Sequence, residues 1–410
     1  ANPIKLSRQD AVEELDNILR NAIAQCMVSD APLGAFLSGG IDSSTVVALM
    51  QQQSSSSVRT FSIGFDEADY DESQYAREVS RHLETNHTEM RLSPRDAQLA
   101  IPDLPRIYDE PFADSSQIPT YLVSRLAREQ VTVALSGDGG DELFGGYNRY
   151  VWGRRLKTAV EWSPFSFRRA LSKSLLAISP GKWDALYRCI DRVPWGKMKE
   201  KQFGDKLHKL AEIICAENCP HMYLLLISQW KHPSNVLLEG EEHQTRISNP
   251  SLWPDFLSFQ EQMMLMDTVS YLPDDILVKL DRATMSIGLE ARVPLLDHEV
   301  FDFAWRLPME MKIHNGVGKS ILREVLEKYV PRNLFVRPKM GFGMPIGDWL
   351  RGGLREWAED YLSADHLREQ GHFNATAIRN VWESHLRGER NNQYILWPIL
   401  MFQSWLEHSE

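Results

Sequence analysis

The sequence predicts an α/β fold with a doubly wound parallel sheet and a large helical C-terminal region. Short apolar runs alternate with amphipathic helical patterns up to about residue 150, which is typical of a parallel sheet with helical crossovers. Beyond that point long helical patterns dominate. We therefore predict an α/β core with an N-terminal helix at residues 1–150. Residues 151–410 form a mostly helical region that completes the substrate pocket and packs with the core as one domain.

Each predicted element follows from its own pattern. Helical spacing of apolar residues, opened by a capping pair of Ser7 and Asp10, predicts the first helix at residues 7–27. Apolar runs predict most of the strands, and the more polar stretch 87–92 is expected to form a further strand. The predicted strands are 33–37, 58–65, 87–92 and 131–135, and further helices are predicted at 43–52, 71–83 and 120–129.

A glycine pair with flanking hydroxyls follows the first predicted strand, in the stretch Ser38-Gly39-Gly40-Ile41-Asp42-Ser43-Ser44. Glycines at a strand-to-helix turn let the backbone approach a ligand closely, and the N–H groups at the helix start attract anionic oxygens. No Lys follows the glycines, so this is not a Walker A loop. The alternative is a plain Ser/Gly turn.

A second glycine-rich turn, residues 136–147 (SGDGGDELFGGY), follows the 131–135 strand. The carboxyl ends of parallel strands meet at one edge of the sheet, so Asp42 and Asp141 are expected to face each other. Two carboxylates together with substrate phosphates suit Mg²⁺. The alternative is that these carboxylates only cap helices.

Composition limits the partners. The formal net charge of −11 argues against nucleic acid, whose binding depends on phosphate neutralisation. No apolar run is long enough for a membrane span and no signal peptide is visible, so we expect no membrane partner. Four cysteines fit a reducing, cytoplasmic location. Cys215 and Cys219 with His221 have possible metal spacing, but packing in a core is the preferred interpretation.

Three motifs in order, at 38–44, 136–147 and 287–297 (IGLEARVPLLD), resemble those of the asparagine synthetase family. The resemblance covers the synthetase half of the glutamine-hydrolysing enzyme. It implies the fold of the PP-loop ATP pyrophosphatases, which is adenine nucleotide alpha hydrolase-like. It also implies the substrates ATP, ammonia and aspartate or a related carboxylate, with Mg²⁺ as cofactor. By the same resemblance, Asp42 and Asp141 bind Mg²⁺, and the ATP-binding residues are Leu37, Ser38, Gly39, Gly40, Ser43, Ser44, Ile63, Ser136 and Gly137.

The resemblance also assigns the two catalytic residues. Lys339 corresponds to a lysine that lies over the α-phosphate, in a glycine-punctuated segment that could move as a lid. Asp138 stands where the well-known members have Glu, which is thought to help form the aspartyl-adenylate. Since Asp is one methylene shorter, the same chemistry on another carboxylate, such as a uronic acid or a β-lactam precursor, is the alternative function. A non-catalytic nucleotide-binding module is the alternative from another class.

The family's glutaminase domain begins with a nucleophilic Cys, whereas this sequence begins Ala1-Asn2-Pro3. The favoured expectation is a piece of a longer protein whose N-terminal glutaminase domain is missing here, and use of free ammonia is the alternative. A homodimer is left open. Around the third motif, we expect Glu290 and Arg292 to form a pair. Lys279, Asp281 and Arg282 are expected either to face the substrate or to pair with each other.

Overall fold

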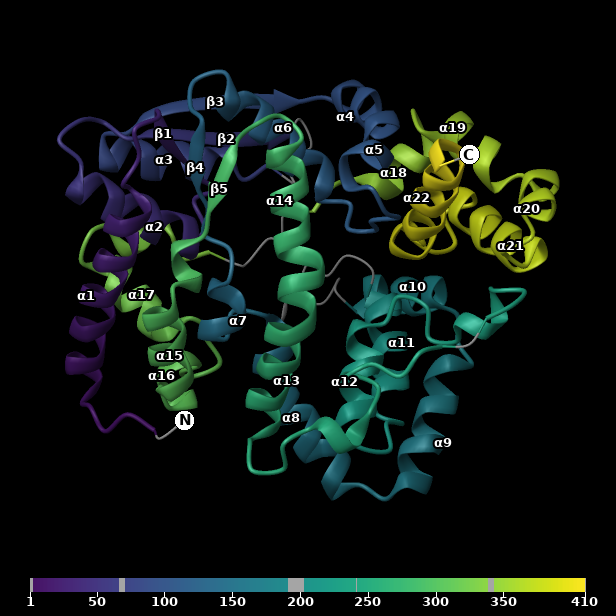
Figure 1. Cartoon of the computed structure of the whole chain (residues 1–410). Helices are drawn as coiled ribbons and strands as arrows, with labels where there is room; N and C mark the ends of the chain where they lie inside the picture. Colours follow the sequence, from purple (N-terminus) through teal and green to yellow (C-terminus); the bar gives the residue numbers. More distant parts are fainter. Residues whose placement is uncertain (1–2, 66–70, 191–202, 241, 338–342, 410) are drawn as a thin grey trace. The chain divides into compact units, whose positions relative to one another are not determined.

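The computed structural model describes residues 3–65, 71–190, 203–240, 242–337 and 343–409, which form two compact units (Figure 1). Unit 1 comprises residues 1–151, 264–345 and 404–410, and unit 2 comprises residues 152–263 and 346–403. Residues 264–345, which the sequence analysis placed in the helical region, therefore belong to the unit that contains the sheet.

Unit 1 contains a parallel sheet, as predicted (Figure 1). Its order in the described part of the chain is β3-β2-β1-β4-β5, and all four neighbouring pairs are parallel. The strands are β1 (Leu33–Phe36), β2 (Arg59–Phe65), β3 (Asn86–Leu92), β4 (Val133–Leu135) and β5 (Glu290–Arg292). The sequence analysis missed β5, and the doubly wound arrangement of the helices stays a prediction.

The strand order reverses between β1 and β4. From β1 the chain adds β2 and β3 on one side, and it then places β4 and β5 on the other side of β1. Such a reversal leaves a crevice at the carboxyl ends of the two strands, where open α/β sheets bind ligands. Both glycine-rich turns begin there, since one follows β1 and the other follows β4.

Helices from distant parts of the sequence share the core of unit 1. Leu15 and Leu19 of α1, Val47 of α2 and Ile321 and Val325 of α17 are fully buried in one apolar cluster. The helices of this unit are α1 (Arg8–Cys26), α2 (Ile41–Gln53), α3 (Ser73–Leu83), α4 (Pro94–Ala100), α5 (Leu104–Tyr108), α6 (Gln117–Arg128), α7 (Gly140–Phe144), α14 (Val278–Met285), α15 (His298–Arg306), α16 (Met309–Lys312) and α17 (Ser320–Glu327). The segments 1–151 and 264–345 of unit 1 thus depend on one another for burial.

A π-helix precedes α14 and spans Asp267–Leu277, with Pro273 inside it. It continues α13 (Phe259–Met266), so one long helical stretch leads into the third sequence motif. π-helical turns are rare and are frequently found at functional sites.

The regular elements of unit 2 are helices among its described residues, as the C-terminal patterns predict, and turns and one isolated β-bridge between Leu237 and Phe373 connect them. Trp382 and Trp397 are among its largest fully buried side chains. Most or all of each of these helices lies in it: α8 (Asn148–Trp162), α9 (Phe165–Leu176), α10 (Pro180–Ile190), α11 (Phe203–Ile213), α12 (Cys219–Ile227), α18 (Ile346–Arg351), α19 (Arg355–Leu362), α20 (Ala364–Gln370), α21 (Ala375–Leu386) and α22 (Gln393–Ser409). Among the described residues of either unit, no helix is long and apolar enough to cross a bilayer.

Candidate active site

The first glycine-rich loop is a cradle of hydroxyl and N–H groups between β1 and α2. The Ser38 and Ser43 hydroxyls lie 3.0 Å apart, and the Gly40 N–H donates to Ser38 Oγ at 3.2 Å. Gly39 has a φ of +73°, and a Cβ there would lie 2.6 Å from the Ala76 nitrogen of α3. Glycine is therefore required both by the backbone conformation and by the close approach of α3. The loop has the form expected of an anion-binding turn.

The second loop packs directly on the first. A Cβ on Gly137 would lie 2.6 Å from the Ser43 nitrogen, and a Cβ on Gly140 would lie 2.4 Å from Oδ1 of Asp42. Only glycine allows this approach, so the two glycine-rich turns open onto one crevice, as their positions after parallel strands predict.

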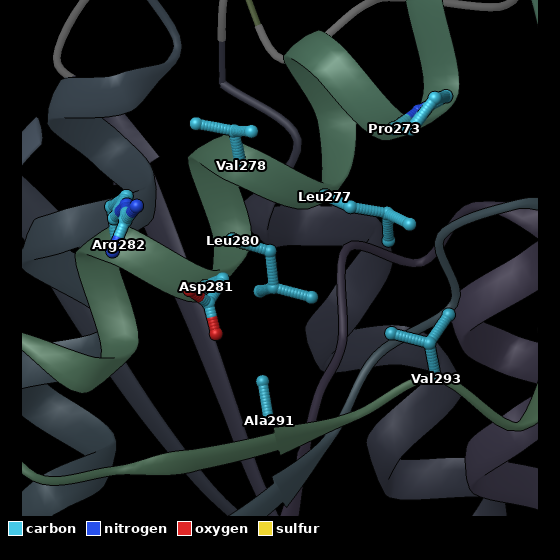
Figure 2. Close-up of a pocket in the computed structure, with 8 residues that line it drawn as sticks. All are labelled: Pro273, Leu277, Val278, Leu280, Asp281, Arg282, Ala291 and Val293. Atoms are coloured by element: carbon cyan, nitrogen blue, oxygen red, sulfur yellow. The ribbon is translucent and has the colours of Figure 1, made fainter. Parts of the chain in front are cut away.

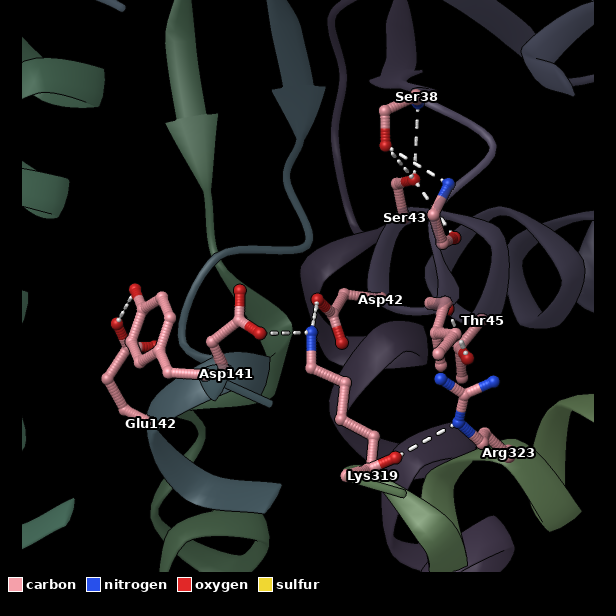
Figure 3. A network of polar contacts seen from close by, with 12 residues as sticks. Ser38, Asp42, Ser43, Thr45, Asp141, Glu142, Lys319 and Arg323 are labelled. Atoms are coloured by element: carbon pink, nitrogen blue, oxygen red, sulfur yellow. Dashed lines mark hydrogen bonds and ion pairs between the residues drawn. The ribbon is translucent and has the colours of Figure 1, made fainter. Parts of the chain in front are cut away.

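Lys319 joins the two loops (Figure 3). Its ammonium contacts Oδ2 of Asp42 and lies 2.7 Å from Oδ1 of Asp141, and Figure 3 shows the two carboxylates on either side of it. The lysine side chain is 7% exposed, so these charges interact in a partly dehydrated environment. Asp42 and Asp141 thus converge on one point, where a cation already sits.

The backbone of residues 315–320 holds Lys319 in place. Lys319 has a φ of +56° immediately before α17, and its N–H donates to the Phe144 carbonyl at 3.0 Å. A Cβ on Gly318 would lie 2.3 Å from the Gly145 oxygen, so this turn fits against the second loop only with glycine. The sequence analysis missed Lys319. A signal was present, because Asn315-Gly316-Val317-Gly318-Lys319 is a third glycine-punctuated turn that ends at a helix.

The charge balance at this point fits a divalent cation. Burial alone would lower the pKa of Lys319, but the carboxylates of Asp141 and Asp42 outweigh it and raise that pKa. Lys319 is therefore cationic at neutral pH. Two carboxylates that already share a cation, beside a turn lined by N–H and hydroxyl groups, are the oxygen donors that Mg²⁺ accepts in combination with substrate phosphates. Among the described residues, no group of three or more His, Cys, Asp or Glu side chains offers a metal site made of protein alone.

Asp138 and Glu142 are buried acids of the second loop. Burial raises the pKa of Asp138, although the Ser136 hydroxyl donates to its Oδ2 at 2.6 Å and counteracts the shift. The charges of both Lys279 and Lys319 act on Asp138. Burial likewise raises the pKa of Glu142 to about 7, while Tyr147 donates a 2.6 Å hydrogen bond to it. Both carboxyls can therefore hold a proton more easily than exposed ones.

Lys279 forms a second buried charge cluster with Asp114 and Asp275. Its ammonium lies 2.7 Å from Oδ2 of Asp114. The Ser116 N–H donates to Oδ1 of the same carboxylate, and the Ser116 hydroxyl donates to Oδ2. Burial, and then the charge of Asp114, raise the pKa of Asp275 to about 7. We expected Lys279, Asp281 and Arg282 either to face the substrate or to pair with each other. Lys279 pairs with Asp114 instead of with Asp281.

The other predicted nucleotide residues lie around the same crevice. Leu37 and Ile63 are buried at the end of β1 and within β2, and Ser136 follows β4. The Ser44 hydroxyl is buried and has no partner among the described residues. Lys339 lies outside the described residues. The predicted pair of Glu290 and Arg292 is confirmed, at 2.7 Å.

A cavity of about 390 Å³ lies elsewhere in unit 1, between α14 and β5 (Figure 2). Asp281 and Arg282 line it, together with apolar side chains that include Leu277 and Val293. Neither glycine-rich loop contributes a lining residue, so we treat this cavity as separate from the candidate active site.

Comparisons with known proteins point to one family over nearly the whole length of the chain. Residues 14–407 match the asparagine synthase family. The chain is 30% identical over 405 residues to "asparagine synthetase [glutamine-hydrolyzing] 1" of Bacillus subtilis, covering 98% of this chain and 60% of that protein. It is 31% identical over 420 residues to a putative asparagine synthetase of Mycobacterium tuberculosis, covering 100% and 60%. Similarity to amidase chyE of Penicillium rubens is lower, at 23% identity over 92% of this chain and 59% of that protein. The chain thus spans about 60% of the length of these curated relatives.

Proposed function

Because the chain belongs to the asparagine synthase family, we propose that it activates a carboxylate with ATP and transfers ammonia to it, giving an amide, AMP and pyrophosphate. The proposed acceptor is aspartate and the product asparagine. The observation that carries the proposal is the convergence of Asp42, Asp141 and Lys319 beside the Ser38–Ser44 cradle.

In the first step a carboxylate oxygen of the acceptor attacks the α-phosphorus of ATP, and the bond to the β-phosphate oxygen breaks. The N–H and hydroxyl groups of the cradle hold the departing pyrophosphate, and Lys319 supplies a fixed positive charge next to it. Asp42 and Asp141 would hold Mg²⁺, which neutralises charge on the leaving group when bound. Lys339 is proposed to face the α-phosphate.

In the second step ammonia attacks the acyl carbon, and AMP leaves with the electrons of the acyl–oxygen bond. The attacking nitrogen must lose a proton, and Asp138 is the proposed acceptor of it. Its raised pKa brings it closer to the range in which a carboxylate works as a base near neutral pH. We propose that a glutaminase portion like that of the glutamine-hydrolysing relatives supplies the ammonia.

The second candidate function is the same chemistry on another carboxylate. It is favoured by Asp138, which is shorter than the Glu of the family motif, and by the similarity to proteins named amidases. A non-catalytic nucleotide-binding module is disfavoured, because buried charges such as Asp42, Asp141 and Lys319 are costly to keep without a function.

Pyrophosphate release tests the proposal. The protein is supplied with ATP, Mg²⁺ and an ammonium salt, and aspartate is compared with a panel of other carboxylates, uronic acids and β-amino acids included. With aspartate labelled by ¹⁸O in its carboxyl groups, one labelled oxygen should appear in AMP, which identifies the adenylate. Release with another carboxylate alone would establish the second candidate.

Asp42→Asn and Asp141→Asn should each remove most pyrophosphate release and leave the protein folded, because each amide keeps the shape of the side chain and loses its charge. Wild-type release by either variant would contradict the assigned metal-binding role. Asp365→Asn is the control, since its side chain is 98% exposed on unit 2, and it should release pyrophosphate at the wild-type rate.

A further inference from the structure

Arg337 lies against the first glycine-rich loop and is nearly buried, with 11% of its side chain exposed. Its Nη2 donates to the Ser38 carbonyl at 3.2 Å and lies 3.5 Å from Oε1 of Glu72. Its guanidinium carbon stacks 3.9 Å from the centre of the Tyr75 ring. These contacts fix the guanidinium plane at the first residue of the cradle.

The other terminal nitrogen of Arg337, Nη1, is buried and has no hydrogen-bond partner among the described residues. A buried guanidinium N–H without an acceptor is costly, and native proteins seldom leave one so. Glu72 and the Ser38 carbonyl engage only the Nη2 side of the fork. Within the described part of the chain, Nη1 is thus a positively charged donor at the loop that has no acceptor.

The chemistry of the guanidinium makes an anionic oxygen the fitting acceptor, because Arg337 is held at the first residue of the glycine-rich loop through the Ser38 carbonyl. Guanidinium groups prefer phosphate and carboxylate oxygens, which they bind in the plane of the fork. Since α3 packs closely on Gly39, the helix that carries Tyr75 and the loop form one rigid support for the guanidinium.

We propose that Arg337 is a further nucleotide-binding residue, whose Nη1 donates to the β- or γ-phosphate of ATP while Nη2 holds the loop through Ser38. The inference rests on the proposed function, because it takes ATP to be the ligand of the cradle. It assigns to Arg337 a contact that AMP cannot make, which separates it from a residue that only supports the loop.

Titration calorimetry with ATP, inorganic pyrophosphate and AMP tests the assignment on the whole chain. Arg337→Gln should weaken the binding of ATP and pyrophosphate by about 10- to 100-fold, as expected for the loss of a charge-assisted hydrogen bond. Its affinity for AMP should stay close to that of the wild type. Arg337→Lys should restore only part of the loss, because one ammonium cannot reach both the carbonyl and a phosphate with the geometry of a fork.

Arg332→Ala is the matched control, since it removes a cation of the same segment that is 73% exposed and paired with Glu327. It should leave all three affinities unchanged. Equal losses of AMP and ATP binding in Arg337→Gln would show a structural role and overturn the assignment, and so would unchanged pyrophosphate binding in a folded variant. If Arg337→Gln does not fold, the same comparison on Arg337→Lys decides. A wild-type chain that binds no ATP would overturn the proposed function itself.

Discussion

At the scale of single residues, Lys319 places a fixed positive charge between two carboxylates on neighbouring loops. In the protein without ligand this ammonium offsets the repulsion between Asp42 and Asp141. In the complex with ATP that we propose, the same charge lies next to the phosphates. One side chain therefore stabilises the empty site and prepares it for an anion, which is how a preorganised site avoids rearrangement during the reaction.

Lys319→Ala should lower the stability of the free protein by about 3–5 kcal/mol, the usual cost of removing one partner from a buried ion pair. If Asp42 and Asp141 hold Mg²⁺, the metal should raise the melting temperature of this variant more than that of the wild type, since it replaces the lost cation. Differential scanning calorimetry with and without Mg²⁺ measures both effects.

Lys328→Ala is the control for that experiment. This lysine follows the last residue of α17, lies 3.0 Å from Asp16 and is 35% exposed. Its removal should therefore lower the free energy of unfolding by about 1 kcal/mol or less. Mg²⁺ should not compensate for this loss. Equal effects of Mg²⁺ on the wild type and on Lys319→Ala would contradict a metal site at the two carboxylates.

At the scale of elements, the crevice depends on how closely the turns after β1 and β4 approach each other. Gly137→Ala places a Cβ 2.6 Å from the Ser43 nitrogen, and the backbone of one loop must move to accept it. We expect this variant to fold with reduced stability and to lose most ATP binding, because the cradle residues shift. Urea unfolding and ATP titration measure the two effects.

Gly181→Ala is the matched control for the glycine prediction. A Cβ at Gly181 meets no atom within 4 Å, and the residue lies in α10. The exchange should therefore leave ATP binding unchanged and stabilise the protein slightly, since alanine is a better helix former. ATP binding by Gly137→Ala at the wild-type level would show that the contact between the loops does not set the site.

The elements also show what the sequence could predict. The strands β1 to β4 were predicted to within two residues, and β1, β2 and β4 carry the apolar pattern that is typical of buried parallel strands. The strand β5 was missed, since Glu290-Ala291-Arg292 is short and polar and its pairing with β4 is a tertiary contact. The π-helix of Asp267–Leu277 has no sequence pattern of its own.

Part of the candidate site was also predictable from the sequence. The loops carry their own glycine signatures, so Asp42 and Asp141 could be placed together from the strand pattern alone. Lys319 and Arg337 reach the loops from almost 300 residues away, through bonds such as that from Arg337 to Ser38. The glycine-punctuated turn before α17 marks Lys319 as a turn residue, but the partners of both cations follow from how the helices pack.

At the scale of the whole molecule, the sheet and its site need chain segments that lie far apart in the sequence. The apolar cluster of α1 and α2 is completed by Val300 and Phe303 of α15 and by Ile321 and Val325 of α17. The edge strand β5 and the cation Lys319 also come from residues 264–345. The N-terminal α/β segment is thus part of a folding unit that closes only after residue 300.

A fragment of residues 1–151 should therefore fail to fold by itself, although the sequence pattern alone suggests an α/β core there. It would expose the faces of α1 and α2 that α15 and α17 cover, and β4 would lose its neighbour β5. Losing this burial outweighs the few kcal/mol by which domains are stable. Urea unfolding of the fragment, followed by circular dichroism, should show no cooperative transition, and the fragment should not bind ATP. The whole chain should unfold cooperatively. A sharp transition of the fragment, or ATP binding by it, would show that residues 264–345 add to a core that is already complete.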